Sequence, residues 1–182
     1  MPAEGAAGNR FTRVSAESEE VCAVPVETGS VEVGAAAPDF TLADQHGARW
    51  RLGQHLPTQT VVVVFYPFAF TGVCTGELRA IQEALPRFQA EEATVVAVSC
   101  DSMFSLRVFA EREGLTFPLL SDFWPHGAVA RDYGVLDEER GCALRGTFVV
   151  DRGGVVRWKV VNAIPDAREL DDCLKAVEQL SA

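Results

Sequence analysis

Apolar residues along the chain follow two kinds of pattern, and each kind predicts a different element. The runs Val61–Tyr66 and Thr94–Ser99 are rich in β-branched residues without alternation, which is typical of central strands buried on both faces. From about Cys74 apolar residues recur at helical spacing, and we expect Pro86 to bend or end this helix. The remaining patterns predict helices at residues 103–113, 124–133 and 166–180 and a short strand at residues 117–120.

Two polar turns divide further apolar segments into hairpins. Asp44–Gly47 interrupts an alternating pattern near the start of the folded region, and residues 151–154 separate apolar residues 146–150 from 155–161. The predicted order is therefore a β-hairpin, then β-α-β-α-β-α, then a second hairpin and a helix. This order favours the α/β class. Parallel inner strands with an antiparallel final hairpin predict a thioredoxin-like fold, in which helices flank a central mixed sheet with an N-terminal β-hairpin.

The length of 182 residues suits one domain with a substantial core. Residues 1–30 contain a single aromatic residue, Phe11, among small, polar and acidic ones. A segment of this composition buries too little apolar surface to offset the entropy of ordering it. We therefore expect a disordered N-terminal extension at residues 1–30 and a thioredoxin-like domain at residues 31–182.

Charge and hydropathy argue against two classes of partner. The net charge is -10 and the basic residues form no cluster, so binding to nucleic acid is not expected. The longest apolar stretch, Val61–Phe70, is interrupted by Pro67 and falls short of the roughly 20 residues that a membrane-spanning helix needs. Residues 1–30 contain no continuous apolar segment of the kind found in signal peptides. We expect a cytoplasmic protein without a membrane partner.

The five cysteines do not form a disulfide or zinc pattern, because their number is odd and no CxxC or zinc-finger spacing occurs. No metal or cofactor is predicted. Most cysteines are expected to be small buried residues, but Cys74 differs from the rest. The segment Phe65–Gly76 has the pattern of a strand that stops, turns and enters a helix with Cys74 in its first turn. Backbone N–H groups and the helix dipole favour a thiolate there, so Cys74 is a candidate nucleophile.

Several motifs around this cysteine resemble those of the peroxiredoxins. The pattern Pro67-x-x-x-Thr71-x-x-Cys74 is similar to the sequence around the peroxidatic cysteine of that family. It is accompanied by APDFTL near the domain start, by LSD at residues 120–122 and by RGTF at residues 145–148. The segments FYPFAFTGVCTGEL and FPLLSDFWPHGAVARDYGV most resemble the alkyl hydroperoxide reductase E type, a one-cysteine class. The resemblance covers residues 31–182 and implies thiol peroxidase activity.

The resemblance also implies roles for four catalytic residues. Cys74 attacks the peroxide, and Arg145 donates hydrogen bonds to the sulfur and to a peroxide oxygen. Thr71 bonds the peroxide through its hydroxyl, and Pro67 shields the sulfur from water. Each of the last three also has a structural alternative, namely an exposed arginine at a strand start, a helix N-cap and a strand terminator. Glu77 is expected to support the first helical turn and to orient neighbouring polar groups, without a catalytic part.

The oxidised cysteine must be reduced again by a second thiol. Two-cysteine relatives place that thiol five residues after the reactive one in the same helix, in a third helix, which here would be residues 103–113, or in a C-terminal arm. Here position 79 is an arginine, and Cys100, Cys142 and Cys173 match none of those places. We therefore expect a one-cysteine mechanism with an external reductant, either a low-molecular-weight thiol or a glutaredoxin- or thioredoxin-like protein. If a cysteine of this chain reduces Cys74 instead, Cys142 is the strongest candidate.

The resemblance further implies a homodimer that packs near the active-site loops. Phe65, Phe68, Phe70 and Trp124 are expected to line the pocket or the dimer surface. The expected substrates are hydrogen peroxide, organic hydroperoxides and peroxynitrite. Two other functions remain open on the same fold: a thiol-disulfide oxidoreductase, which would need CxxC where this chain has Thr71-x-x-Cys74, and a non-enzymatic redox sensor.

Overall fold

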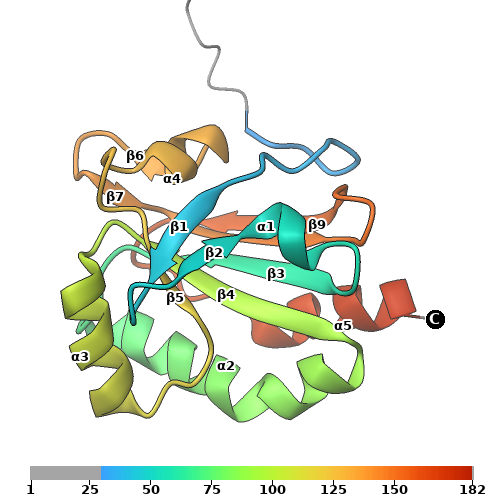
Figure 1. Ribbon diagram of the computed structural model, residues 1–182, viewed down its shortest axis with the longest axis horizontal. Coiled ribbons are helices and arrows are strands. Elements are labelled where there is room, and N and C mark those ends of the chain that lie inside the picture. Colours follow the sequence, from blue (N-terminus) through green and yellow to red (C-terminus); the bar gives the residue numbers. More distant parts are fainter. Residues whose placement is uncertain (1–29, 182) are drawn as a thin grey trace, which may run out of the picture.

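The computed structural model describes residues 30–181, without the side chain of Ser181, and one seven-stranded sheet crosses its centre (Figure 1). The extension predicted for residues 1–30 lies outside the described residues, apart from Ser30. The strands are β1 (Thr41–Asp44), β2 (Arg49–Arg51), β3 (Thr60–Phe65), β4 (Ala93–Ser99), β5 (Leu119–Ser121), β6 (Leu136–Asp137), β7 (Cys142–Ala143), β8 (Arg145–Val150) and β9 (Val156–Asn162). The helices are α1 (Leu52–His55), α2 (Gly72–Ala90), α3 (Met103–Glu113), α4 (Ala128–Asp132) and α5 (Leu170–Ser181).

The sheet is mixed, with the strand order β2-β1-β5-β4-β3-β8-β9. Strand β4 runs parallel to both β3 and β5, whereas β8 pairs antiparallel with β3 and with β9. The N-terminal hairpin β1–β2 extends one edge through antiparallel pairing of β1 with β5. The prediction of a thioredoxin-like α/β fold with a central mixed sheet and an N-terminal hairpin is therefore confirmed.

Each face of the sheet carries its own apolar core, because successive side chains of a strand point to opposite faces. Val62, Val64 and Tyr66 pack with residues of α2, α3 and α5 on one face. Val61 and Val63 pack with residues of α1 and α4 on the other face, and Figure 1 shows the helices divided between the two sides in this way. The continuous apolar run of β3 reflects burial on both sides.

Three predicted helices differ from those observed. Helix α2 continues past Pro86 to Ala90. Helix α4 begins only at Ala128, since Gly127 adopts a left-handed φ of 66° that interrupts a helix. Helix α5 begins at Leu170 rather than near residue 166, because the backbone and side chain of Arg168 are bonded to Glu77 of α2. Helix α1 and the small β6–β7 hairpin were not predicted.

No helix within residues 30–181 combines the length and the apolar character needed to cross a membrane.

Candidate active site

The segment that leads to Cys74 begins where β3 leaves the sheet. Tyr66 still donates its backbone N–H to the carbonyl of Val98 at 3.0 Å, but the next residue is the buried Pro67, which has no N–H to continue the ladder. The chain then turns, and α2 begins at Gly72. Cys74 is therefore in the first turn of α2, as predicted, and its side chain is fully buried. The unpaired N–H groups of that turn favour negative charge near the sulfur.

Arg145 reaches this cysteine from the first residue of β8. The register of β3 with β8 pairs Val64 with Thr147, so the start of β8 lies beside the end of β3 from which the cysteine loop departs. Nη1 of Arg145 lies 3.4 Å from Sγ of Cys74. Arg145 is only 2% exposed, so the alternative of an exposed arginine at a strand start is wrong. The structure brings together the two residues that the resemblance paired.

Glu77 lies one helical turn after Cys74 and pairs with two buried arginines. Its Oε2 accepts from Nη1 of Arg145 at 2.5 Å, and its Oε1 accepts from Nε of Arg168 at 3.1 Å. The side chain of Glu77 is 7% exposed. The sequence suggested that Glu77 supports the first turn of α2 and orients neighbouring polar groups. The structure shows which groups these are, because Glu77 pairs with two buried arginines beside the cysteine.

Arg168 is the member of this cluster that the sequence did not predict. Its guanidinium donates to the backbone carbonyl of Phe65 at 2.7 Å and to Oγ1 of Thr147 at 2.8 Å. Burial lowers the pKa of Arg168, and the Glu77 carboxylate opposes that effect. Arg168 precedes α5 among polar and acidic residues, where nothing in the local pattern distinguishes it from a solvated arginine.

A second contact orients the guanidinium of Arg145. Its Nε donates to the carbonyl of Ile164 at 2.6 Å, which leaves Nη1 directed at Sγ of Cys74 and at Glu77. With Cys74 as a thiolate, the two guanidinium groups would face two anions. Buried charges are tolerated only when they are paired, and Nη1 of Arg145 contacts both Glu77 and the sulfur of Cys74.

The two remaining predicted residues lie in the turn between β3 and α2. Thr71 occupies the N-cap position of α2, but its side chain makes no capping bond. Its hydroxyl donates instead to the carbonyl of Phe68 at 3.0 Å, and Thr71 is exposed. Pro67 is buried. Both residues therefore lie in the segment that leads to Cys74, with Thr71 exposed to solvent and Pro67 buried.

The other cysteines of the described region are free, buried and in environments that keep them protonated. Burial raises the pKa of Cys100 and of Cys173 to about 12 in each case. Burial also raises the pKa of Cys142, and the nearby Asp137 carboxylate adds to that effect. A protonated thiol is a poor nucleophile.

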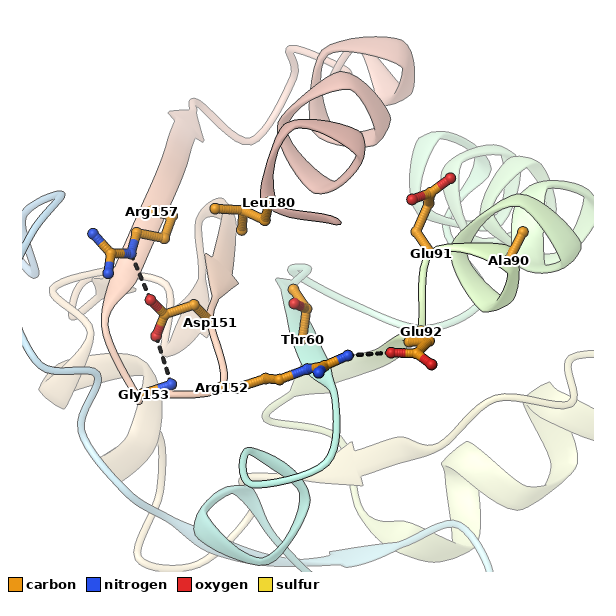
Figure 2. A pocket seen from close by; sticks show the side chains of 9 residues that line it. All are labelled: Thr60, Ala90, Glu91, Glu92, Asp151, Arg152, Gly153, Arg157 and Leu180. Atoms are coloured by element: carbon orange, nitrogen blue, oxygen red, sulfur yellow. Dashed lines mark hydrogen bonds and ion pairs between the residues drawn. The ribbon is translucent and has the colours of Figure 1, made fainter. Parts of the chain in front are cut away.

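A pocket of about 670 Å³ lies at the far end of the sheet from Cys74, and Figure 2 shows the side chains that line it. It is bordered by Thr60, where β3 begins, and by the β8–β9 turn at residues 151–153. The six residues of β3 place it roughly 20 Å from the cysteine loop. Arg152 pairs with Glu92 across it, and Arg157 pairs with Asp151 on one side of it, within the β8–β9 hairpin. It is therefore separate from the cysteine site. No group of three or more potential metal-binding side chains occurs within residues 30–181.

Comparison with known proteins finds relatives over most of the chain. The family model of the AhpC/TSA family matches residues 33–159. Alkyl hydroperoxide reductase E of Mycobacterium tuberculosis is 45% identical over 150 residues, which cover 81% of this chain and 98% of the relative. The 2-Cys peroxiredoxin BAS1 of Spinacia oleracea is 29% identical over 182 residues, covering 94% of this chain and 68% of the relative.

Solved structures show the same fold. The crystal structure of peroxidoxin BcpB from Mycobacterium tuberculosis matches with a TM-score of 0.75 at 30% identity and covers 82% of this chain and 98% of the other. The reduced 2-Cys peroxiredoxin of Plasmodium vivax matches with a TM-score of 0.74 at 27% identity, covering 80% of each chain. The chain therefore belongs to the AhpC/TSA family and is a peroxiredoxin, an enzyme that reduces peroxides with a cysteine thiol.

Proposed function

We propose that Cys74 is the cysteine that attacks the peroxide, and that Arg145, Thr71 and Pro67 complete the catalytic site. The observation that carries this proposal is the 3.4 Å contact between Nη1 of Arg145 and Sγ of Cys74. A thiolate attacks one peroxide oxygen in line with the O–O bond. The S–O bond forms, the O–O bond breaks, and its electron pair leaves on the other oxygen, which takes a proton and departs as alcohol or water. The cysteine becomes a sulfenic acid.

Arg145 serves this step in two ways. Its charge stabilises the thiolate before attack, and its N–H groups meet the charge that develops on the breaking O–O bond. Ile164 and Glu77 hold the guanidinium in place, so its dipoles need little reorganisation during the reaction. Arg168 acts through Glu77 and is a positioning residue rather than a catalytic one.

Thr71 and Pro67 complete the site from the turn before α2. The exposed position of Thr71 suits a hydroxyl that meets an incoming peroxide, and the hydroxyl can accept and donate at the same time. The buried ring of Pro67 provides an apolar wall without an N–H group and keeps water from the sulfur.

The mechanism uses one cysteine of the chain, and reduction comes from outside. The raised pKa values of Cys100 and Cys173, about 12 in each case, support this proposal, since an internal resolving thiol must ionise to attack the sulfenic acid. Cys142 is buried with a raised pKa as well. The sulfenic acid of Cys74 condenses with a low-molecular-weight thiol, or with a thiol of a glutaredoxin- or thioredoxin-like protein, to form a mixed disulfide and water. A second external thiol then attacks the reductant's sulfur, which forms a disulfide outside the chain and releases Cys74 as a thiolate. A cytoplasmic location suits this reductant, because thiols are kept reduced there.

Several exposed apolar side chains lie near the site and bear on its substrates. Phe68, Phe70 and Val73 are 40%, 48% and 42% exposed on the segment that leads into and begins α2. They offer an apolar approach for organic hydroperoxides, while hydrogen peroxide and peroxynitrite need only the reacting atoms. Phe65 does not contribute, because it is buried in the core on the opposite face of the sheet.

A homodimer is the assembly that we propose. Phe104, Phe123 and Trp124 form an aromatic surface around a hollow of about 500 Å³, and Trp124 is 81% exposed. Monomers rarely leave such a group of large aromatic residues in water. A second copy of the chain would cover it. We also propose that residues 31–182 form one domain, since a single sheet joins β1 to β9.

Stopped-flow oxidation of the reduced protein tests the proposed function. We expect the wild type and Cys142→Ser to react with hydrogen peroxide at the same rate and Cys74→Ser to be inert. Intact mass after one equivalent of peroxide should show a sulfenic acid, or its adduct with a trapping reagent, and no internal disulfide. A disulfide that disappears in Cys142→Ser would contradict the one-cysteine mechanism, and a wild type no faster than free cysteine would favour a sensor role.

A further inference from the structure

The turn between β3 and α2 is anchored by a side chain from another strand end. After Tyr66 the β3–β4 ladder stops, because Pro67 has no N–H to donate. Two residues later the backbone N–H of Ala69 donates to Oδ2 of Asp101 at 2.9 Å. Ala69 is itself buried. The Asp101 carboxylate therefore provides a backbone anchor for this turn at a point where the sheet no longer does.

Asp101 is in turn held from two sides. The same Oδ2 accepts from the hydroxyl of Ser99, at the end of β4, at 2.9 Å. The backbone carbonyl of Asp101 accepts from the hydroxyl of Ser121, at the end of β5, at 2.7 Å. Because the ends of two parallel strands fix it, Asp101 is a rigid support for Ala69.

The turn that this bond anchors contains a strained residue. Phe70 has a φ of 64°, in the left-handed region that residues with a side chain rarely adopt. Its ring packs edge-on against Phe109 of α3, with the ring centroids 5.0 Å apart. A strained conformation persists only where its surroundings enforce it. The bond to Ala69 on one side and the ring contact on the other supply that enforcement.

We propose that Asp101 is a positioning residue for the peroxide reaction. Its bond to Ala69 holds the strained turn at Phe70, and the turn sets where Thr71 and the first turn of α2 lie relative to Arg145. Loss of the bond lets the turn relax and moves Thr71 and Cys74 out of line with the peroxide. The inference rests on the proposed roles of Cys74, Thr71 and Arg145, and it adds a residue that touches none of the reacting atoms.

Three variants test the proposal. Asp101→Ala removes the acceptor, whereas Asp101→Asn retains an oxygen that can accept from both Ala69 and Ser99. Asp151→Ala is the matched control, because Asp151 also accepts backbone N–H bonds, from Gly153 and Val155, but lies in the β8–β9 turn at the far end of the sheet. For each protein, peroxide oxidation is measured by stopped flow, and alkylation of Cys74 by iodoacetamide is measured by mass.

The two reactions separate positioning from a general loss of structure. Alkylation needs an accessible thiolate but no alignment with Thr71 and Arg145. We expect Asp101→Ala to lose about 100-fold in its peroxide rate constant, the effect typical of a misplacement of about 1 Å, while alkylation is unchanged. A general loss of structure would instead expose the buried thiol of Cys74 and speed its alkylation. Asp101→Asn should remain within about fivefold of the wild type, and Asp151→Ala should match it.

Other outcomes overturn the inference. Asp101→Ala oxidising as fast as the wild type, Asp101→Asn as slow as Asp101→Ala, or a change in the alkylation rate as large as the change in the peroxide rate would each reject it and leave the function of Cys74 intact. A wild type that is inert to peroxide would reject the proposed function itself and the inference with it. Should Asp101→Ala fail to fold, hydrogen exchange of the wild type decides. We expect the Ala69 amide to be protected by at least about 100-fold, and exchange at the unprotected rate would overturn the proposal.

Discussion

Nη1 of Arg145 lies 3.4 Å from Sγ of Cys74, although 71 positions separate the two residues in the chain. Antiparallel pairing of β8 with β3 places both at one end of the sheet. The cation approaches the sulfur from a strand, while the N-terminus of α2 approaches it through the backbone. Two independent sources of positive potential thus converge on one buried thiol.

The geometry of Arg145 predicts that a lysine cannot replace it. Lysine retains the charge but lacks the planar fork that bonds the carbonyl of Ile164 and Glu77 together while facing Sγ of Cys74. We expect Arg145→Lys to lower the peroxide rate constant by about 10²- to 10³-fold, the loss typical of one preorganised donor. Stopped-flow oxidation of the reduced protein measures it. Arg157→Lys, at an exposed ion pair, serves as the control and should react normally; equal rates for both variants would contradict the assigned role.

Glu77 should matter for stability more than any exposed carboxylate. Its neutralisation in Glu77→Gln leaves the buried guanidinium groups of Arg145 and Arg168 without their shared anion. Removal of one partner from a buried ion pair typically costs about 3–5 kcal/mol, and we expect a loss of that size in the free energy of unfolding from urea titration. Glu92→Gln, whose pair with Arg152 is exposed, should change it by less than about 1 kcal/mol. Equal effects would show that the buried cluster is not stabilised by Glu77.

The buried thiols predict a loss of stability in alkali. Folding raises the pKa of Cys100 and of Cys173 from 9.0 to about 12. Above pH 9 the unfolded chain loses these protons while the folded protein keeps them, so the free energy of unfolding falls as the pH rises between the two values. From pH 8 to pH 10 each thiol should contribute a loss of about 1 kcal/mol.

Urea unfolding under a non-thiol reductant at the two pH values measures this loss. The double variant Cys100→Ala/Cys173→Ala should lose about 2 kcal/mol less than the wild type over the same interval. A double variant with the same dependence on pH as the wild type would show that these thiols are not its source.

The exposed aromatic surface predicts a dimer that one charge can dissociate. Trp124 is 81% exposed and borders the hollow formed with Phe104 and Phe123. We expect Trp124→Glu to sediment as a monomer at concentrations where the wild type is a dimer, since a buried unpaired charge opposes association. Val33→Glu, at a residue 56% exposed elsewhere, should remain dimeric. A wild type that sediments as a monomer would reject the proposed assembly.

Local pattern was sufficient to predict the sheet and the position of Cys74. The apolar runs of β3 and β4 suit only a central strand that is buried on both faces. The turn signals at residues 44–47 and 151–154 mark both hairpins within a few positions. The start of α2 could be read from the same short segment. These features depend on neighbours in the chain, and composition over a few residues is enough to specify them.

Helix ends that depend on distant contacts were predicted less well. Helix α5 starts at Leu170 because Arg168, which precedes it, is hydrogen-bonded to Glu77, 91 positions away.

The aromatic residues before Cys74 also separate in a way that the sequence did not predict. Phe65, Phe68 and Phe70 were expected to line the pocket or the dimer surface together, but Phe65 packs in the core on the opposite face of the sheet from Cys74.

By itself the sequence determined the fold class and the place of Cys74 in the first turn of a helix, and through resemblance it paired Cys74 with Arg145. Only the tertiary structure decided that Glu77 and Arg168 support that arginine and that Asp101 anchors the turn before the cysteine. The reason is physical: a carboxylate or guanidinium has the same local pattern whether it faces water or a buried partner. Strand order and the crossing helices bring these charges together, and no short segment contains that information.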